Sequence, residues 1–552
     1  MRRHGAIIGL AACLAAGLAP AHAEVEPARW AALGAPKLAP GMDTLPMPAV
    51  AAPNSADQAG VADEIRVALQ RMLERDEHAL LASFYAGRSH SPAWIREDGF
   101  TRGAEQVLAR LARAGEDGLD PADYASPQPG SFGAARTPAE AVAETEIAIS
   151  AAVMRYVRDA QAGRVTPGEV SGYITAAPDR PDAIAALAEI ASARYPAQAL
   201  AAYNPPHEGF RALRRALAEL READSEPEAM VEVPGGSSLR PGMRDTRVAA
   251  LRERLGVMSD ADPDLYDSPL EAAVRAYQER SGLGIDGVVG PQTLGLLNTN
   301  EHAREADIVA NMERWRWLPR DMGDLHVHVN IADFTLAIVR GGEPYYTSRV
   351  IVGTPENQTP IFSNAISHIV VNPYWNVPSS IAVNELLPQL KRNPYALSSR
   401  GFEVVSQNGN RIDPGRVDWW GSRGMPYRIR QAPGENNALG RIKFMFPNDH
   451  AVYLHDTPQR TLFDRQARAL SHGCVRVQNP FEFADALLVN EKELNGDRLR
   501  GLIGRSERWV SLQAPVPVHL SYFTTFVDEA GDLQVRADMY GHDRRLKAAL
   551  GL

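Results

Sequence analysis

The sequence predicts a multidomain α+β protein that combines a helical domain, a small helical module and a β-rich domain with an insertion. Three observations support this class. The chain has 552 residues, too many for one hydrophobic core, which indicates about three domains. Apolar residues recur at helical spacing in the first part of the chain and at every second position from about residue 324. Stretches rich in proline and glycine separate these parts.

The first residues are typical of a secretory signal, which we expect at 1–23. Arg2 and Arg3 precede an apolar run, and Ala21-His22-Ala23 supplies a small-x-small cleavage pattern. One alternative is an uncleaved membrane anchor, although the run is short for a bilayer span. Another is lipoprotein processing at Cys13, because the residues before it resemble a lipobox. No later segment is apolar enough to span a membrane, so we expect an exported protein without a membrane span after cleavage.

The composition, 45% hydrophobic and 23% charged, is typical of globular proteins. A formal net charge of -10 gives no indication of nucleic-acid binding. Of the two cysteines, only Cys474 would remain after export. A lone thiol forms no internal disulfide and is at risk of oxidation outside the cytoplasm. Cys474 is therefore either buried and inert or retained for its reactivity.

The N-terminal half is expected to be mainly helical. An Ala- and Pro-rich linker at 24–60 leads into a helical domain at 61–225. Apolar residues begin at Ile65 with spacing i, i+4, i+7 and i+8, which is one face of a helix. Residues 141–157 predict a long helix that ends near Gly163. We find no catalytic constellation in this domain.

A Pro- and Gly-rich linker precedes a compact module at 239–298, where we expect short helices and Pro291 in the first turn of the last one. A β-rich domain follows at 324–503, with a hairpin at Gly341-Gly342. Within it, residues 374–440 are rich in Pro, Gly, Asn and Arg and indicate an insertion, which in compact domains is often a lid. Residues 504–552 are expected to form a C-terminal extension.

The residues that indicate chemistry fall in two runs, Tyr453-Leu454-His455-Asp456 and Ser471-His472-Gly473-Cys474-Val475-Arg476. A thiol attacks as its thiolate and needs a base nearby, for which His455 is the candidate. Gly473 has no side chain, so we expect the N–H groups of Gly473 and Cys474 to form an oxyanion hole. Asn479-Pro480 predicts the capped start of a helix just after this run.

The same residues allow two other interpretations. Cys474 could be a small buried hydrophobe, with His455 and His472 as hydrogen-bonded core residues. The three side chains could instead bind zinc, but the sequence has no CxxC or HExxH spacing. We expect neither a metal nor another cofactor.

His455 followed at a distance by Ser471-His472-Gly473-Cys474 matches the signature of the YkuD-type L,D-transpeptidases. Further segments resemble the large YcbB-like branch of that family, namely 118–124, 311–319, 372–378, 443–448 and 515–522. The helical domain is similar to the scaffold domain of that branch, and residues 239–298 resemble a peptidoglycan-binding helical module. Arg476 stands where many smaller YkuD enzymes have Asn, so no role is transferred from that Asn.

The resemblance implies a ping-pong acyl transfer on peptidoglycan in the periplasm. Cys474 would attack the carbonyl after the third stem residue and expel D-Ala, and a side-chain amine of a neighbouring stem would resolve the thioester into a cross-link. His455 would move protons, oriented by the backbone carbonyl of Asp456, and His472 would act through its backbone and packing. Substrate positioning would involve the remaining candidates Tyr374, Trp375, Tyr453 and Arg476. The family also implies acylation of Cys474 by carbapenems.

Two rival functions stay open. With water as acceptor, the same thioester would give an L,D-carboxypeptidase or an enzyme that releases wall-bound protein. A scaffold that binds the wall without catalysis would use the helical domain and the module at 239–298. The expected partners are stem peptides as donor and acceptor, with other cell-wall synthesis proteins as further candidates.

Overall fold

The computed structural model describes nine stretches of the chain: 58–72, 76–96, 99–125, 137–223, 231–258, 262–281, 283–298, 301–421 and 427–552. The expected signal at 1–23, Cys13 and most of the linker at 24–60 lie outside these residues. The predicted fold class is confirmed, because a helical domain, a small helical module and a β-rich domain are all present. Within the described stretches, no helix combines the length and apolar character needed to cross a bilayer.

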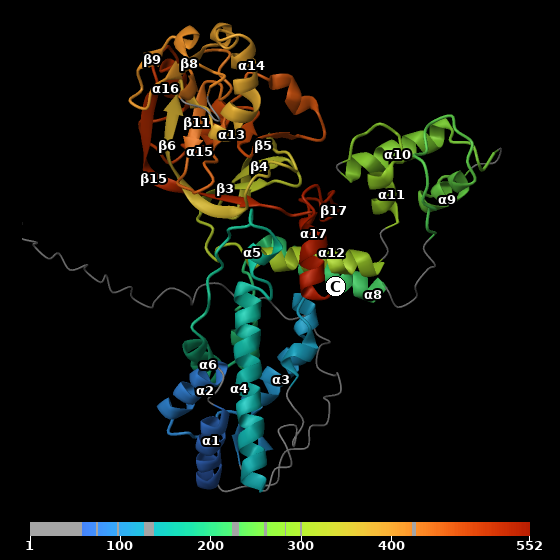
Figure 1. Ribbon diagram of the computed structural model, residues 1–552. Coiled ribbons are helices and arrows are strands. Elements are labelled where there is room, and N and C mark those ends of the chain that lie inside the picture. Colours follow the sequence, from blue (N-terminus) through green and yellow to red (C-terminus); the bar gives the residue numbers. More distant parts are fainter. Residues whose placement is uncertain are drawn as a thin grey trace, which may run out of the picture. The chain divides into compact units, whose positions relative to one another are not determined.

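The helical domain is built around one long helix, α4 (Pro138–Ala162). Its apolar residues, such as Ile147, Val153 and Val157, share one buried cluster with the helices around it, which Figure 1 shows on several sides of α4. The other elements are α1 (Gln58–Met72), α2 (Asp76–Gly87), β1 (Ile95–Arg96), β2 (Gly99–Phe100), α3 (Arg102–Ala112), η1 (Ala114–Asp117), η2 (Pro121–Tyr124), α5 (Pro167–Val170), α6 (Ala183–Ser192), α7 (Pro196–Ala201) and α8 (Glu208–Ala223).

The predicted helix at 141–157 is confirmed: it ends before Gly163, as expected, and it begins at Pro138, earlier than predicted. At its start the Thr137 hydroxyl accepts a hydrogen bond from the Glu140 N–H, and Pro138 occupies the first turn, where its missing N–H costs nothing. At its end Gly163 has a φ of +91°, which few other residues adopt. Thr137 therefore sets the start of the helix, which apolar periodicity places too late, and Gly163 sets its end.

The small module contains three helices around a core that includes Val248, Leu251, Leu270 and Val274. They are α9 (Arg247–Arg254), α10 (Ser268–Arg280) and α11 (Pro291–Leu297). Pro291 is the first residue of α11, as predicted from its fit to the first helical turn.

The β-rich domain contains a nine-stranded mixed sheet in the order β13-β5-β14-β12-β11-β6-β15-β3-β4. Because β4 also pairs with β5, the sheet closes on itself. The predicted hairpin is confirmed, since Gly341 and Gly342 join β4 to β5 with φ values of +60° and +86°. The strands are β3 (Leu325–Asn330), β4 (Thr335–Arg340), β5 (Glu343–Gly353), β6 (Phe362–Val371), β11 (Ile442–Met445), β12 (Leu454–His455), β13 (Ala469–Ser471), β14 (Val475–Val477) and β15 (Arg508–Ser521).

Residues 504–552, which we expected to form a C-terminal extension, contribute a strand to the sheet, β15. Strand β15 lies between β6 and β3, inside the sheet, so residues beyond 503 form part of its centre. The strand contains Gln513, Pro515 and Pro517, and its register shifts between Ser511 and Val516. These polar and proline residues are unusual for a central strand and concealed its place from a reading of the sequence.

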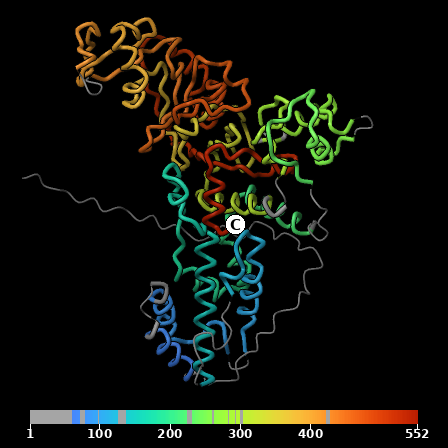
Figure 2. Tube along the Cα trace, turned by 45° about the vertical axis from the view of Figure 1, so that its right-hand side comes forward, coloured from blue at the N-terminus to red at the C-terminus, as the bar shows by residue number. Residues whose placement is uncertain are grey.

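The insertion forms a compact unit with its own sheet, in the order β7-β10-β8-β9, and its own apolar cluster around Leu387, Leu390 and Trp419. Figures 1 and 2 show these elements gathered at one end of the β-rich domain. They are β7 (Trp375–Asn376), α13 (Ser379–Ile381), the π-helical η3 (Ala382–Leu386), α14 (Leu387–Arg392), η4 (Ser398–Arg400), β8 (Phe402–Val405), β9 (Arg411–Ile412), η5 (Pro414–Arg416) and β10 (Arg428–Gln431).

Further helices pack beside the sheet. Helix α15 contributes Phe483 and Leu487 to the sheet core; it begins at Pro480 as expected, but the side chain of Asn479 makes no capping hydrogen bond. Helix α12 packs with α8 through a cluster that includes Met312 and Trp315. The remaining elements are α12 (Glu301–Trp315), η6 (Arg460–Asp464), α15 (Pro480–Leu487), α16 (Gly496–Gly501), β16 (Thr525–Val527), β17 (Leu533–Val535) and α17 (His542–Leu550).

The residues before α17 support a loop at the end of β5. The Tyr540 hydroxyl donates a hydrogen bond of 2.6 Å to the Gly353 carbonyl and accepts one of 3.2 Å from the Thr359 N–H. Both partners are buried. Tyr540 therefore provides hydrogen-bond partners for the buried Thr359 N–H and the buried Gly353 carbonyl.

Tyr540→Phe is expected to destabilise this loop by about 1–3 kcal/mol, because it leaves a buried N–H and a buried carbonyl unpaired. Hydrogen exchange read by mass spectrometry should become faster in the peptide spanning residues 353–359. Tyr345→Phe, at an exposed position on β5, is the control and should leave the exchange unchanged. Equal protection in wild type and Tyr540→Phe would contradict the proposed support.

Candidate active site

Cys474 lies between β13 and β14 on a tight turn that only glycine allows. Gly473 has a φ of +109°, and a side chain there would come within 3.3 Å of the Gln358 carbonyl oxygen. The Cys474 side chain is half-buried, and its Sγ lies 3.9 Å from the carbonyl oxygen of Ala451. The turn thus presents the thiol at the beginning of β14.

Short hydrogen bonds hold the turn in place. The Ser471 hydroxyl donates to the Cys474 carbonyl at 2.6 Å and accepts from the Gly473 N–H at 3.1 Å. The Thr359 hydroxyl donates to the Gly473 carbonyl at 2.8 Å and accepts from the Gly353 N–H at 2.9 Å. The loop supported by Tyr540 therefore also fixes the backbone beside the thiol.

The expected oxyanion hole needs correction. The Gly473 N–H is engaged by Ser471, because a serine two residues earlier places its hydroxyl inside the turn. The Cys474 N–H, in contrast, makes no hydrogen bond to any of the residues that the structure describes. Of the two predicted donors, only Cys474 keeps its backbone N–H available.

His455 is buried on β12, with its ring orientation fixed by the backbone. Its Nδ1 lies 2.5 Å from the carbonyl oxygen of Asp456. A carbonyl only accepts, so Nδ1 carries the proton and Nε2 keeps a lone pair. Burial, helped by the charge of Arg476, lowers the pKa of His455 to about 3, against the opposing effect of the Asp456 carbonyl. The imidazole is therefore neutral over the physiological range.

The carboxylate of Asp456 serves the surrounding loop. It accepts hydrogen bonds from the backbone N–H groups of Arg441 and Thr457, and it pairs with Arg460 at 2.6 Å. Its side chain is buried. The Asp456 backbone orients His455, while its side chain joins the segments before β11 and after β12.

The thiol is neutral at rest. Burial raises the pKa of Cys474, and this effect outweighs the opposing influences of Tyr453, Arg476 and Lys443. Tyr453 also contacts the His455 ring edge to face, with 5.7 Å between ring centroids. Within the described stretches no hydrogen bond joins His455 to Cys474, and Tyr453 lies beside both residues.

Three basic side chains lie in a row on one face of the sheet. Lys443 on β11 pairs with His455 on β12, and His455 pairs with Arg476 on β14. Directly paired residues point to the same face, and their neighbours point to the other. The neighbours Ile442, Phe444, Leu454, Val475 and Val477 all lie in the hydrophobic core.

Lys443 was not a predicted site residue, although its segment was noted for its resemblance to the YcbB-like branch. The available signal was one charged residue inside an otherwise apolar strand, Ile442–Met445. Such a residue is ordinarily assigned to the solvent face of a sheet. Here that face carries the candidate active site, and Lys443 is only 8% exposed.

His472 contacts the insertion. Its Nε2 lies 2.8 Å from a carboxylate oxygen of Glu385 on η3, and both side chains are about half exposed, 48% and 49%. This contact joins the insertion directly to the cysteine motif. Sequence reasoning missed Glu385, because nothing local marks a residue that meets its partner across a long stretch of chain.

Tyr374 and Trp375 lie at the start of the insertion, and their contacts are made there. The guanidinium of Arg430 lies 4.5 Å from the centre of the Tyr374 ring, and Trp375 packs edge to face on Phe402. Among the contacts of the described residues, none joins either aromatic side chain to Cys474. The structure thus brings Tyr453 and Arg476 to the thiol, but not Tyr374 or Trp375.

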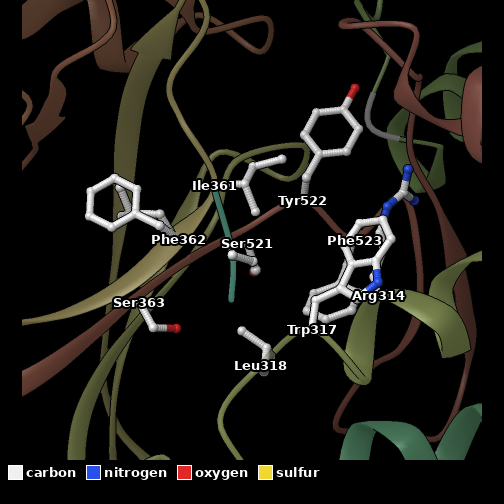
Figure 3. Close-up of a pocket in the computed structure, with 11 residues that line it drawn as sticks. Arg314, Trp317, Leu318, Ile361, Phe362, Ser363, Ser521, Tyr522 and Phe523 are labelled. Atoms are coloured by element: carbon white, nitrogen blue, oxygen red, sulfur yellow. The ribbon is translucent and has the colours of Figure 1, made fainter. Parts of the chain in front are cut away.

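A cavity of the chain lies away from this motif. Figure 3 shows Trp317, Phe523 and Arg314 on one side of it and Phe362 and Ser363 on the other. Arg314 pairs with Asp543 at 2.5 Å, which makes this region a junction between helices and sheet.

In the part of the chain that the structure describes, no group of three or more His, Cys, Asp and Glu side chains could hold a metal ion.

Three protein families match successive parts of the chain. Residues 79–217 match "Scaffold domain", residues 248–297 match "Putative peptidoglycan binding domain" and residues 324–498 match "L,D-transpeptidase catalytic domain" of the YkuD family. A curated relative from Haemophilus influenzae, named "Putative L,D-transpeptidase", is 37% identical over 245 residues. That match covers 44% of this chain and 49% of the relative, so the chain spans about half the length of this relative.

Solved structures give more distant matches. An L,D-transpeptidase from Xylanimonas cellulosilytica is 17% identical with a TM-score of 0.17, covering 52% of this chain and 98% of that one. One from Mycobacterium smegmatis is 12% identical with a TM-score of 0.18, covering 36% and 58%. Since these scores carry no structural argument, the assignment rests on the matched domains. Residues 324–498 thus carry an L,D-transpeptidase catalytic domain of the YkuD type.

Proposed function

We propose that this protein is an L,D-transpeptidase that cross-links third-position stem residues of peptidoglycan through a thioester on Cys474. The placement of Cys474 carries this proposal. The half-buried thiol stands at the start of β14, and His455 lies on the neighbouring strand β12 with its tautomer fixed by Asp456. The matched catalytic domain supports the same chemistry.

Each half of the reaction moves one proton through His455. In the first half, the Sγ of Cys474 bonds to the carbonyl carbon after the third stem residue. The thiol proton passes to Nε2 of His455 and then to the D-Ala amine, as the C–N bond breaks. In the second half, an amine of a neighbouring stem attacks the thioester, the C–S bond breaks and the thiol regains a proton. His455 can begin each half as a base because it is neutral.

The other site residues would position the reacting groups. The Cys474 N–H would donate to the developing oxyanion. Ser471 and the backbone of Gly473 would hold the turn, and His472 would hold the insertion through Glu385. Tyr453 and Arg476 would contact the donor peptide beside the thiol. Tyr374 and Trp375 would act as parts of the insertion, which we propose is a lid.

The proposed partners and location follow from the substrate. Stem peptides would serve as donor and acceptor, and the domain at 248–297 would hold the protein against the wall. Such a protein acts outside the cytoplasm. We propose that it is located in the periplasm and that residues 1–23 are its export signal. Carbapenems, whose ring carbonyl resembles an activated acyl donor, would acylate Cys474.

Cys474→Ala is expected to abolish both the acyl-enzyme and the cross-links. Intact-mass measurement with a tetrapeptide-stem donor should show one acyl adduct on wild type and none on the variant. His455→Gln should slow adduct formation by roughly 10²–10⁴-fold, because it removes the base. Equal cross-link content in walls from wild-type and Cys474→Ala cells would contradict the proposal. Release of the donor acyl group to water, despite an added amine acceptor, would favour the carboxypeptidase.

The protonation state of the resting site predicts a distinctive pH profile. The pKa of Cys474 is raised and that of His455 is lowered to about 3, so both shifts disfavour a thiolate–imidazolium pair. Alkylation of Cys474 by iodoacetamide should therefore rise steadily from pH 6 to beyond the usual thiol pKa of about 8.5. A rate that is constant between pH 5 and 7 would show the ion pair instead. Cys474→Ala controls for labelling elsewhere.

Glu385→Ala is expected to loosen the lid. An exposed ion pair is worth about 1 kcal/mol or less, so the open population should rise by at most roughly fivefold. Labelling of Cys474 by a bulky maleimide should accelerate by that factor, with an unchanged unfolding temperature. Glu435→Ala is the matched control, because Glu435 lies in the same insertion and pairs only with Arg441 in an exposed site. Equal labelling rates in both variants would exclude a latch at Glu385.

A further inference from the structure

Lys443 is a buried cation for which the proposed acyl transfer has no use. Its side chain is 8% exposed, and its Nζ lies 5.4 Å from the centre of the Tyr453 ring and 5.9 Å from that of Trp509. Within the described stretches, no carboxylate lies within the 4.0 Å that defines an ion pair with it. The ammonium group is thus held between two aromatic rings.

The carboxylate of Glu507 is the first charge that opposes the effect of burial on the Lys443 pKa. Both of its oxygens already accept hydrogen bonds. One of its carboxylate oxygens accepts from the Tyr374 N–H at 2.8 Å, and the other accepts from the Trp509 ring N–H at 3.2 Å. Burial lowers the pKa of Lys443, against the opposing charges of Glu507 and Cys474. A buried charge without a close partner is costly, so an apolar residue would serve the fold better at this position.

Lys443 is one of two such cations in the row across the sheet. Arg476 stands two strands away, with its Nη1 bound to the neutral amide of Gln459 at 3.0 Å, and the uncharged His455 lies between them. Adjacent strands are about 4.8 Å apart, so the two backbones are separated by roughly 10 Å. Within the described stretches, neither cation has a carboxylate at ion-pair distance, and the Glu507 carboxylate acts on Lys443 only from further away.

The row continues to an exposed aromatic side chain. Val370 on β6 pairs with Lys443 on one side and with Trp509 on the other. Trp509 is 61% exposed and stacks on His368 with ring centroids 4.8 Å apart. A ligand that reaches the thiol along this row would pass the Trp509 ring and then meet Lys443.

We propose that Lys443, between the rings of Tyr453 and Trp509, binds a carboxylate of the donor peptide and selects acidic stem peptides. The inference rests on the proposed function, and it adds a specificity residue on the side of His455 opposite Arg476. The carboxylate would supply the missing counter-ion, and the aromatic walls would exclude water from the pair.

The test compares donors and variants in steady-state kinetics of the full chain. The donors are a tetrapeptide stem and the same stem with its carboxylates converted to carboxamides one at a time. Lys443→Met, of similar length and without charge, should raise KM for the free-acid donor by about tenfold or more and change kcat less than threefold. Lys443→Arg should restore most of the affinity, because it restores the charge.

One amidated donor should bind wild type as poorly as the free-acid donor binds Lys443→Met, and it should lose no further affinity on that variant. Two results would overturn the inference. One is a lower kcat with unchanged KM, which would mean that Lys443 acts on the thiolate. The other is an equal loss for every amidated donor in both proteins. An unchanged unfolding temperature shows that Lys443→Met is folded. Failure of the proposed function would appear separately, as a wild type that forms no acyl-enzyme.

Discussion

The site depends on one constraint, the two-residue alternation of side chains along β6, β11, β12 and β14. On one face of these strands, Val371, Phe444, Leu454 and Val475 enter a shared apolar core. The other face presents Lys443, His455 and Arg476 in a single row, because these residues are paired directly across the ladder. A slip of one residue in β11, β12 or β14 would bring a basic residue into the core in place of an apolar one. The hydrophobic core therefore fixes the register that places the basic row beside the thiol.

The face of the sheet opposite the core has a different role, which explains the polar atoms around Cys474. This face holds buried cations that the fold alone would not favour, as we propose for a face that receives a charged peptide. Backbone groups and small hydroxyls then hold the reactive residues in place. Ser471 and Thr359 bind the turn, and the Asp456 carbonyl sets the His455 ring. The insertion reaches the same motif through Glu385.

Much of this arrangement could be predicted from sequence, because its signals are local. Apolar spacing revealed the helices, glycines revealed the β4–β5 hairpin, and the spaced histidine and cysteine revealed the motif. What was missed depends on contacts between distant segments. Strand β15 carries too many polar and proline residues to be recognised as central, and Glu385 and Lys443 gain their roles only from neighbours in space. The engagement of the Gly473 N–H by Ser471 is a matter of local geometry that residue types alone do not reveal.

The position of β15 and Tyr540 late in the chain has a consequence for the order of assembly. Strand β15 completes the closed sheet, and Tyr540 completes the hydrogen bonds of the loop behind Gly473. A chain that emerges from its N-terminus exposes Cys474 before either element exists. The thiol therefore stays in an unfinished setting, without its supporting loop, until residues 508–540 have been made. The setting of Cys474 is thus complete only once residues 508–540 have packed into the sheet and against its loop.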